Sequence, residues 1–583
     1  MRRITETTPM NLFARTRHCI AVAALATLAH ADTLTGTVVN QSGLPIAGAT
    51  VVCNGLSVIT TATGTFSFTV PSGVYSVDVA PPAASGLATA HIEDMHVAGT
   101  LNVGNMTLVP GVTISGLVLY GTTGLPVPNG DMDVIDAATG QKLYTPSDNT
   151  ALTGIYTITV PPGTYKIVAD PAPAGAATFA SQEVGPFTVT ANTTIPTITL
   201  QPGFQVTATI LRGDTGLPLK DCDVDFDIVA LGQRVPTPTD LTNLLGVVTV
   251  VVPAGTYRMY IDPAPGDAYL GQQIAAVTVT GPTNLGTITL GTGNVVSGYV
   301  NGNGVGVPKT SIELEPAYGG TKRYTSNNKT AHDGWFRVMM PADACRFDAI
   351  PPANSGFAPA QTTAMTAANI VAAAPFTINV PAGGVLSGTI YGLGGVLADA
   401  AVSLNDPLTG ALIYTTGSSS NANGVYSRLV PNGTWNATIR PHRFSFAQAI
   451  TIPVLVNGNT TLDVNLPFPS AMTVMLPAIA IPPSIPNGGA MWFDFAIYNV
   501  LPTVAGYNVS LTLHDPSNAV TTVLPTTPFV MMPGELVFAP SIAIPLPILP
   551  PTFLGLPHRL RITITDAATG LEIDRDEQVL VIS

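Results

Sequence analysis

Four aspartates alternate with apolar residues near the middle of the chain, in the stretch Asp221-Cys222-Asp223-Val224-Asp225-Phe226-Asp227-Ile228. Because successive side chains of a strand point to opposite faces, the four carboxylates are expected on one face. Carboxylate oxygens are ligands that Ca²⁺ prefers, although the stretch lacks the spacing of a calcium-binding loop. Two interpretations therefore stand: a calcium site at Asp221, Asp223 and Asp225, or an acidic face screened by water and salt. Asp131 and Asp133 form a weaker version of the same pattern.

A second group of potential metal ligands lies in the stretch His91-Ile92-Glu93-Asp94-Met95-His96. In a strand, positions 91 and 96 face opposite sides, so the two histidines cannot share a metal without a turn between them. A polar loop is the simpler interpretation. The chain also lacks a Gly-x-Ser-x-Gly nucleophile elbow and a phosphate-binding glycine loop. We therefore expect no catalytic residues and no organic cofactor, and the chain is not expected to be an enzyme.

Aromatic side chains on a surface can stack against sugars, and the chain has three tryptophans: Trp335, Trp435 and Trp492. Trp435 replaces the tyrosine of a repeated hairpin described below. Trp335 is followed by Phe336, which matches the aromatic position of the repeat, so alternation directs Trp335 towards solvent. Trp335 is therefore the best candidate for a glycan contact.

These residues are organised by a hairpin motif, called the hairpin phrase below, that occurs five times in the sequence. It reads Val160-Pro161-Pro162-Gly163-Thr164-Tyr165 in its second copy, and its first proline recurs at positions 71, 161, 253, 341 and 431. Proline and glycine favour a tight turn, and the alternating apolar residues on both sides favour antiparallel strands. A spacing this regular, close to 90 residues, indicates an array of similar modules.

Composition supports small β-sandwiches. Charged residues make up only 10% of the 583 residues, while Gly and Pro number 56 and 52. Many short, alternating strands with Gly- and Pro-rich turns are typical of all-β proteins, and a module of this length suits a sandwich of about seven strands. The predicted fold is all-β: five tandem Ig-like or transthyretin-like β-sandwiches followed by a sixth, Ig-like one.

The period also predicts the boundaries. Residues 1–31 have a basic front, an apolar run and the small-x-small site Ala29-His30-Ala31, which is the pattern of a secretory signal peptide. The predicted repeats, numbered first to fifth below, are residues 32–110, 111–202, 203–292, 293–383 and 384–467. Residues 468–583 depart from the period and form the predicted C-terminal domain.

Charge excludes one class of partner. The chain has 22 basic and 35 acidic residues, a net charge of −13, and loss of residues 1–31 makes it about −16. An acidic chain without a basic stripe repels phosphate backbones, so nucleic acid is not an expected partner. The apolar run near the N-terminus is too short to span a bilayer, so no transmembrane segment is expected.

The repeated pattern resembles a known family. An opening strand, a Gly-x-Pro turn, a Gly-x-(Tyr/Phe) strand, the Pro-x-Gly-x-Tyr hairpin and a closing strand such as Asn459–Leu466 are similar to the carboxypeptidase regulatory-like domain, over residues 33–467. The resemblance implies a transthyretin-like sandwich, related to the B-type stalk repeats of bacterial collagen adhesins, and a stalk or accessory role. Those adhesin repeats often join a first-strand lysine to a last-strand asparagine. The opening strands here carry no lysine, so no isopeptide bond of that kind is expected.

The sequence thus favours an exported, non-catalytic structural or adhesive protein: a rod of modules that acts as a stalk, matrix component or fibre subunit. Lysines that would protect edge strands are scarce, and the first and fifth repeats have none. The predicted partner is therefore another copy of the chain. The alternative is a cell-surface protein that binds polysaccharide.

Overall fold

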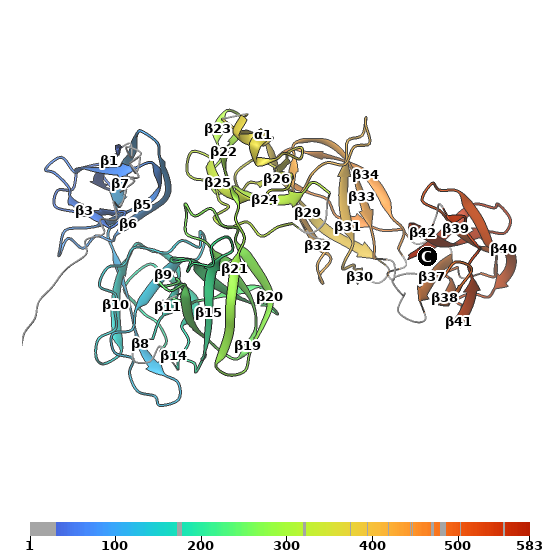
Figure 1. The fold of residues 1–583 in the computed structure, drawn as a ribbon, viewed down its shortest axis with the longest axis horizontal. Helices are drawn as coiled ribbons and strands as arrows, with labels where there is room; N and C mark the ends of the chain where they lie inside the picture. The colour runs from blue at the N-terminus through green and yellow to red at the C-terminus, as the bar shows by residue number, and fades with distance from the viewer. Residues whose placement is uncertain are drawn as a thin grey trace, which may run out of the picture. The chain divides into compact units, whose positions relative to one another are not determined.

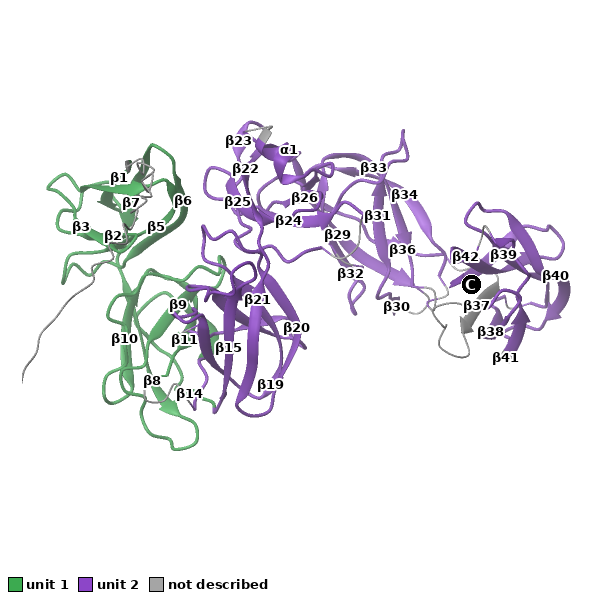
Figure 2. Cartoon of the chain, in the orientation of Figure 1, with its two compact units in different colours: residues 1–176, 182–201 green, residues 177–181, 202–583 purple. Residues whose placement is uncertain are grey.

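The computed structural model describes residues 31–582, apart from residues 172–177, 239, 319–321, 373–374, 393–394, 418, 443–444, 446, 468–470, 478–484, 502 and 552–553. The predicted signal peptide thus lies almost wholly outside the described residues. The chain forms two compact units, residues 1–176 with 182–201 and residues 177–181 with 202–583 (Figure 2). Within the described part, no helix is long and apolar enough to cross a membrane.

The first repeat shows the pattern that the others vary (Figure 1). Its strands form one sheet of order β4–β1–β7 and a second of order β3–β2–β5–β6. In β4, Phe66, Phe68 and Val70 are buried while the residues between them are exposed, as a half-buried strand requires. The strands are β1 (Ala31–Asn40), β2 (Thr50–Cys53), β3 (Leu56–Ile59), β4 (Thr65–Pro71), β5 (Gly73–Ala80), β6 (Ala90–Val97) and β7 (Thr100–Leu108).

The second and third repeats are also built from two sheets each. Their orders are β10–β8–β13, with β14 also on β8, and β12–β11–β9 in the second repeat, then β18–β15–β21 and β17–β16–β19–β20 in the third. The strands are β8 (Val112–Tyr120), β9 (Met132–Asp136), β10 (Ile155–Val160), β11 (Gly163–Ala169), β12 (Gln182–Val189), β13 (Thr193–Thr194), β14 (Ile198–Leu200), β15 (Phe204–Arg212), β16 (Asp223–Ile228), β17 (Gln233–Val235), β18 (Val247–Val252), β19 (Gly255–Asp262), β20 (Gln272–Val279) and β21 (Thr283–Leu290).

The fourth repeat has sheets β23–β22–β25, with β28 also on β22, and β24–β26–β27. The fifth has β30–β29–β32, with β35 and β36 also on β29, and β31–β33–β34. Their elements are β22 (Asn294–Gly302), β23 (Val305–Gly306), β24 (Ser311–Pro316), β25 (Trp335–Met340), β26 (Cys345–Ile350), β27 (Ala360–Gln361), α1 (Ala367–Ala372), β28 (Thr377–Asn379), β29 (Gly383–Gly392), β30 (Gly395–Val396), β31 (Ala401–Asn405), β32 (Val425–Pro431), β33 (Gly433–Arg440), β34 (Ile450–Val456), β35 (Thr460–Thr461) and β36 (Val464–Asn465).

The C-terminal domain has longer strands in two sheets, β37–β38–β41 and β40–β39–β42–β43. They are β37 (Ala471–Pro477), β38 (Ala490–Asn499), β39 (Ala505–His514), β40 (Val520–Met531), β41 (Leu536–Pro545), β42 (Pro557–Asp566) and β43 (Glu572–Val581). Separate clusters of buried side chains lie in the first, third, fourth and fifth repeats and in this domain. The predicted all-β fold of tandem sandwiches is confirmed. The individual boundaries stay predictions.

In each repeat the opening strand pairs in parallel with a closing strand, and antiparallel with the strand that leads into the hairpin. In the first repeat β1 pairs with β7 from Thr33–Thr100 to Asn40–Leu108. The same parallel pairing joins β8 to β13 and β14, β15 to β21, β22 to β28, and β29 to β35 and β36. The repeated sequence therefore specifies a repeated topology.

The hairpin phrase works through a hydrogen bond that closes its own turn. The hydroxyl of Tyr257 donates to the carbonyl oxygen of Pro253 at 2.7 Å, and the ring lies over the turn, where a Cβ on Gly255 would be 3.0 Å from the hydroxyl. Glycine is therefore needed beneath the ring. The same bond is made by Tyr75, Tyr165 and, through its indole N–H, Trp435. Tyr165 and Tyr257 are buried, so their rings also anchor the core of their repeats.

The fourth repeat loses both parts of this arrangement together. Asp343 replaces the turn glycine and Cys345 replaces the aromatic residue. Cys345 is fully buried and fills part of the core in place of the ring. Without a ring above the turn, a side chain at position 343 meets no obstacle. Cys53, Cys222 and Cys345 are all free thiols in separate repeats.

A hydroxyl bridge also recurs in all five repeats. Thr150 Oγ1 donates to the carbonyl oxygen of Val127 at 2.6 Å and accepts from the N–H of Gly130 at 2.8 Å. Both backbone groups are buried, so the hydroxyl satisfies groups that water cannot reach. The equivalent bridges are made by Thr60, Thr242, Thr330 and Ser420.

Candidate functional site

The side chains most capable of chemistry lie at an equivalent place on the second sheet of the second, third and fourth repeats, and we call this charged group in each repeat its strip. We define the strip by three equivalent ion pairs: Lys142–Asp133, Arg234–Asp225 and Lys322–Glu313. Each acid lies in register with the residue three places after the hairpin aromatic position. Each base precedes the bridging threonine of its repeat by the same number of residues. The sequence period therefore determines the positions of these ion pairs as well as those of the strands.

In the third repeat the strip holds a surplus of carboxylates. Asp223 and Asp225 project from β16 and approach Asp240, which follows β17; their carboxylate oxygens lie within 4.8 Å of one another. Such a group could hold a hard cation such as Ca²⁺. Asp221, which the sequence placed in the site, precedes the strand and forms an ion pair with Lys220 at 2.8 Å. The structure thus brings Asp240, and not Asp221, to the other two.

A protein cation already lies in this group. Arg234 on β17 pairs with Asp225 and, at 3.0 Å, with Asp227, and its guanidinium lies 5.7 Å from the ring centre of Tyr260. A built-in positive charge weakens the case for a metal, because it supplies part of the neutralisation that a metal would provide. Calcium at Asp221, Asp223 and Asp225 accordingly stays a prediction.

The surplus of acid changes the protonation of Asp223. Burial, followed by the neighbouring carboxylates of Asp225, Asp240 and Asp262, raises its pKa to about 7 against the opposing effect of Arg234. Desolvation and like charges both disfavour the ionised form. Asp223 therefore titrates near neutral pH, far above an ordinary aspartate.

The second repeat has a similar group. Carboxylate oxygens of Asp131, Asp133 and Asp170 lie within 4.8 Å of one another, and Lys142 binds Asp133. Burial, followed by the charges of Asp131 and Asp133, raises the pKa of nearby Asp148, while its hydrogen bond with Thr145 lowers it. The sequence pattern identified Asp131 and Asp133. It could not identify Asp170, which lies beyond the hairpin and meets Asp131 only through strand pairing.

In the fourth repeat carboxylates neutralise the positive charge of the strip, and its lysine also contacts the fifth repeat. Lys322 contacts Asp348 and Glu313, each at 2.6 Å, and Asp348 is fully buried. Lys322 also donates to the hydroxyl of Tyr414, from the fifth repeat, at 3.2 Å. Burial opposes the charge of Lys322, but hydrogen bonds with Asp348 and Glu313 outweigh it and raise its pKa. One lysine thus joins two repeats.

The preceding joint uses the equivalent tyrosine. Tyr324 of the fourth repeat donates to the carboxylate of Asp262 in the third, at 2.6 Å and 2.8 Å from its two oxygens, and its ring lies 5.1 Å from that of Tyr260. Asn327 adds a bond to the carbonyl oxygen of Pro263 at 3.2 Å. In the first unit, Thr89 donates to the carbonyl oxygen of Tyr144 at 2.5 Å. Tyrosines 144, 324 and 414 recur with the period, a signal that the sequence interpretation missed.

The histidine-rich stretch does not assemble a shared metal site. His91 lies in β6 with Nδ1 2.6 Å from Asp78 and Nε2 3.6 Å from Glu93. The hydrogen bond with Asp78 raises the pKa of His91 against the effect of burial. Gln141 of the second repeat donates to Glu93, so this cluster also lies at a joint. The stretch is a strand rather than the loop that was predicted.

Trp335, the predicted glycan contact, is half-buried in β25 and lies in register with Tyr299 of β22. Phe336 beside it is fully buried, as the alternation required. A sugar contact at Trp335 stays a prediction.

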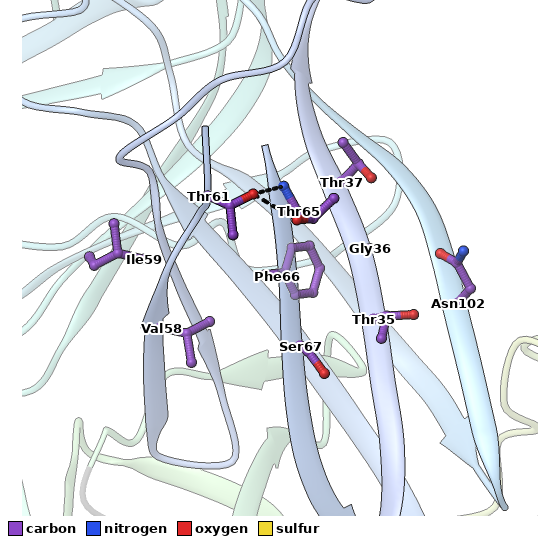
Figure 3. A pocket seen from close by; sticks show the side chains of 10 residues that line it. All are labelled: Thr35, Gly36, Thr37, Val58, Ile59, Thr61, Thr65, Phe66, Ser67 and Asn102. Atoms are coloured by element: carbon purple, nitrogen blue, oxygen red, sulfur yellow. Dashed lines mark hydrogen bonds between the residues drawn. The ribbon is translucent and has the colours of Figure 1, made fainter. Parts of the chain in front are cut away.

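Shallow grooves lie elsewhere, on the outer face of the first sheet. In the first repeat a groove of about 500 Å³ is lined by Thr35, Thr37, Ser67 and Asn102, together with Val58 and Ile59, beside the edge of Phe66, whose ring fills the space above Gly36 (Figure 3). The second repeat has an equivalent groove of about 660 Å³ at Gly116. Their linings are hydroxyls, amides and aliphatic groups, which can bind through weak polar contacts but carry no titratable side chain.

Residues 33–109 match the carboxypeptidase regulatory-like domain family. The predicted resemblance is thus confirmed for the first repeat, and for the other repeats it rests on the period described above. No curated protein matches the chain.

Solved structures are similar only in part. The Bacillus anthracis TIE protein is 16% identical over 45% of this chain and 51% of its own, with a TM-score of 0.14, so the match spans about half of that protein. A DUF3823 family protein from Bacteroides ovatus is 16% identical over 34% of this chain and 97% of its own (TM-score 0.18). A streptococcal ancillary pilin is 12% identical over 45% and 98% (TM-score 0.14). With TM-scores of 0.14 to 0.18, these similarities do not support a conclusion about the function of this chain.

Proposed function

We propose that this chain is an exported, non-catalytic structural protein whose repeats act as a stalk, matrix component or fibre subunit. The proposal rests on the contacts that the reactive side chains make with neighbouring repeats. Within residues 202–583, two of these side chains bind across joints between repeats: Tyr324 to Asp262, and Lys322 to Tyr414. Residues in an active site face a substrate, whereas these residues face the next repeat.

The joints suit a load-bearing role. Each combines a buried or half-buried carboxylate with a hydrogen-bonded tyrosine ring, so both a polar bond and apolar area hold consecutive repeats. The net charge of −13 makes copies of the chain repel one another at low salt. Salt screens this repulsion, so copies can approach one another at higher ionic strength. Lateral or end-to-end association of copies is the second part of the proposal.

Two measurements test the proposal separately. Antibody against the chain should label intact cells of the source organism, and labelling only after permeabilisation would overturn the export. Sedimentation velocity of the full chain should show association that strengthens from low to physiological salt. A purely monomeric chain at tens of micromolar under every condition would overturn self-association and leave the stalk role.

A further inference from the structure

The outer face of the first sheet in the first repeat is built from uncharged polar side chains. Strand register places nine of them in three rows across β4, β1 and β7: Thr69–Thr33–Thr100, Ser67–Thr35–Asn102 and Thr65–Thr37–Asn105. We call these nine residues the polar face. All nine are exposed or half-buried, whereas Phe66 and Phe68, which alternate with them in β4, are buried in the core. Because opposite side chains of neighbouring strands lie close together, each row is a continuous surface.

The polar face is uncharged although the chain is acidic. β4 and β7 contain no acidic or basic residue, and the one in β1 is Asp32, which is buried and accepts a hydrogen bond from Ser72 at 2.6 Å. Metal ions and anionic polymers therefore meet no opposite charge there. The polar face also lacks the apolar and aromatic anchors found at the centre of protein–protein interfaces.

Its hydrogen-bonding groups are available to a ligand. Within the described residues, the hydroxyls of Thr37 and Ser67 make no hydrogen bond with the protein. The hydroxyl of Thr35 makes only a long one, at 3.4 Å, with a backbone carbonyl oxygen. Asn102 accepts from the N–H of Gly104 at 2.8 Å through its amide oxygen, so its amide N–H groups can still donate. Because a hydroxyl both donates and accepts, the polar face offers both kinds of group.

A groove runs over part of the polar face and has an apolar wall. Figure 3 shows Val58 and Ile59 of β3 on one side of the groove and Thr35, Thr37 and Asn102 on the other. The side chain of Ile59 is 60% exposed. The groove volume of about 500 Å³ lies within the usual range of small-ligand sites. A ligand in the groove therefore meets a hydrogen-bonding floor and an apolar wall together.

The middle row of the polar face recurs in three other repeats. Its equivalents are Thr157–Ser115–Thr194, Thr249–Thr207–Asn284 and Ser427–Ser387–Thr461 in the second, third and fifth repeats. The groove of about 660 Å³ in the second repeat lies on strands without an acidic or basic residue. In the fourth repeat Arg337 lies opposite Ser297, so the row is interrupted. A row that recurs along the chain suits a ligand whose own chemistry recurs, because several weak contacts can then add.

We propose that the grooves of the first and second repeats bind a neutral polysaccharide. A sugar ring carries hydroxyls on its rim and C–H groups on its faces. Its hydroxyls can exchange hydrogen bonds with Thr35, Ser67 and Asn102, while its C–H groups pack against Val58 and Ile59. A neutral polymer also matches a surface without charge and is not repelled by the acidic chain. The site is separate from Trp335 and adds a ligand to the structural role proposed above.

Affinity electrophoresis of the full chain tests the proposal, in gels that contain starch, galactomannan, arabinoxylan or mixed-linkage β-glucan, with polygalacturonate as the anionic polymer. The groove variant combines Thr35→Val, Ser67→Ala, Ser115→Ala and Thr194→Val. Valine keeps the shape of threonine and favours strands, so the repeats remain folded. The matched control removes four hydroxyls from the second sheets of the second and third repeats: Thr164→Val, Thr188→Val, Thr256→Val and Thr278→Val.

At least one neutral polysaccharide should retard the unmodified chain and the control, and polygalacturonate should retard neither. The groove variant should bind at least about ten-fold more weakly, because it loses two or more hydrogen bonds to the sugar. An unmodified chain that no neutral polysaccharide retards would overturn the proposal, as would a control that loses as much affinity as the groove variant. Binding that Trp335→Val abolishes and the groove variant retains would place the contact in the fourth repeat and overturn the grooves as the site.

Discussion

The third and fourth repeats place a basic side chain at the same point of the same sheet but surround it differently. Arg234 lies among more carboxylates than it can neutralise, and Asp223 responds with a pKa of about 7. Lys322 binds one half-buried and one fully buried carboxylate and reaches Tyr414 of the following repeat. The comparison shows that the sequence period determines where a basic side chain is placed. The neighbouring residues then determine whether its charge is balanced, as in the fourth repeat, or outnumbered by carboxylates, as in the third.

Truncation of the hairpin residue should lower the stability of the third repeat far more than that of the fourth, and this is the largest expected difference. Tyr257→Ala removes a buried ring and its bond to Pro253, and such truncations cost about 3–5 kcal/mol. Cys345→Ala removes one sulfur from the fourth repeat and should cost about 1 kcal/mol. Hydrogen exchange resolved by repeat measures both. Equal losses in the two repeats would show that the tyrosine is not an anchor.

Removal of the lysine should be the next largest effect. Lys322→Met leaves Asp348 buried without its cation and should destabilise the fourth repeat by about 2–3 kcal/mol, below the usual figure because Lys322 is partly exposed. Arg234→Met, whose partners are less buried, should cost less. Adding Asp348→Asn to Lys322→Met should restore much of the loss. A double variant as unstable as the single one would contradict this account.

The stability of the third repeat should depend on pH between about 4 and 7 more than that of the fourth repeat does. Because burial and neighbouring acids raise the pKa of Asp223 in the folded state, the folded chain holds a proton that the unfolded chain releases. This contribution is greatest below pH 4, declines as the pH rises towards 7, and is constant above that. Because Asp223 is only half-buried, solvent screening should reduce the loss to on the order of 2 kcal/mol, about half of what the shift alone implies. Asp223→Asn should remove the decline. Chemical denaturation monitored in the third repeat from pH 4 to pH 8 measures it.

Calcium should have a smaller effect, and it can distinguish the two carboxylate sets. If Ca²⁺ binds Asp223 and Asp225, millimolar Ca²⁺ should stabilise the third repeat by about 1 kcal/mol at pH 8 and by less at pH 5.5, where Asp223 is protonated. Asp240→Asn should abolish the effect if the structural group binds, and Asp221→Asn if the sequence pattern does. Calorimetry that shows no heat of binding at either pH would remove the calcium interpretation.

The smallest expected effect concerns Trp335. The third repeat has Val247 at the equivalent position, so Trp335→Val makes the fourth repeat resemble the third without altering the strand. If the ring contacts polysaccharide, retention of the full chain on isolated cell-surface polysaccharide should fall several-fold, since one stacking contact is worth about 1 kcal/mol. Unchanged retention would exclude Trp335 as the contact.

The fold was predictable because its signals are local and repeated. Alternation, the Pro-x-Gly turn and the glycine beneath Tyr257 each act within a few residues, and five copies make the pattern unmistakable. The site was only half predictable. Asp223 and Asp225 share a strand face, which alternation reveals, but Asp240 reaches them from a loop and Tyr324 reaches Asp262 from another repeat. Such partners depend on loop path and on packing between repeats, which local pattern does not encode.

The parallel pairing of opening and closing strands has a mechanical consequence. In the first repeat the chain enters at the start of β1 and leaves at the end of β7, and these two points lie at opposite ends of one paired ribbon. Tension along the chain therefore slides the two strands past each other and loads their hydrogen bonds together. A hairpin pulled at its open end would release its bonds one after another. Each repeat is thus built to resist being stretched along the direction in which its neighbours pull.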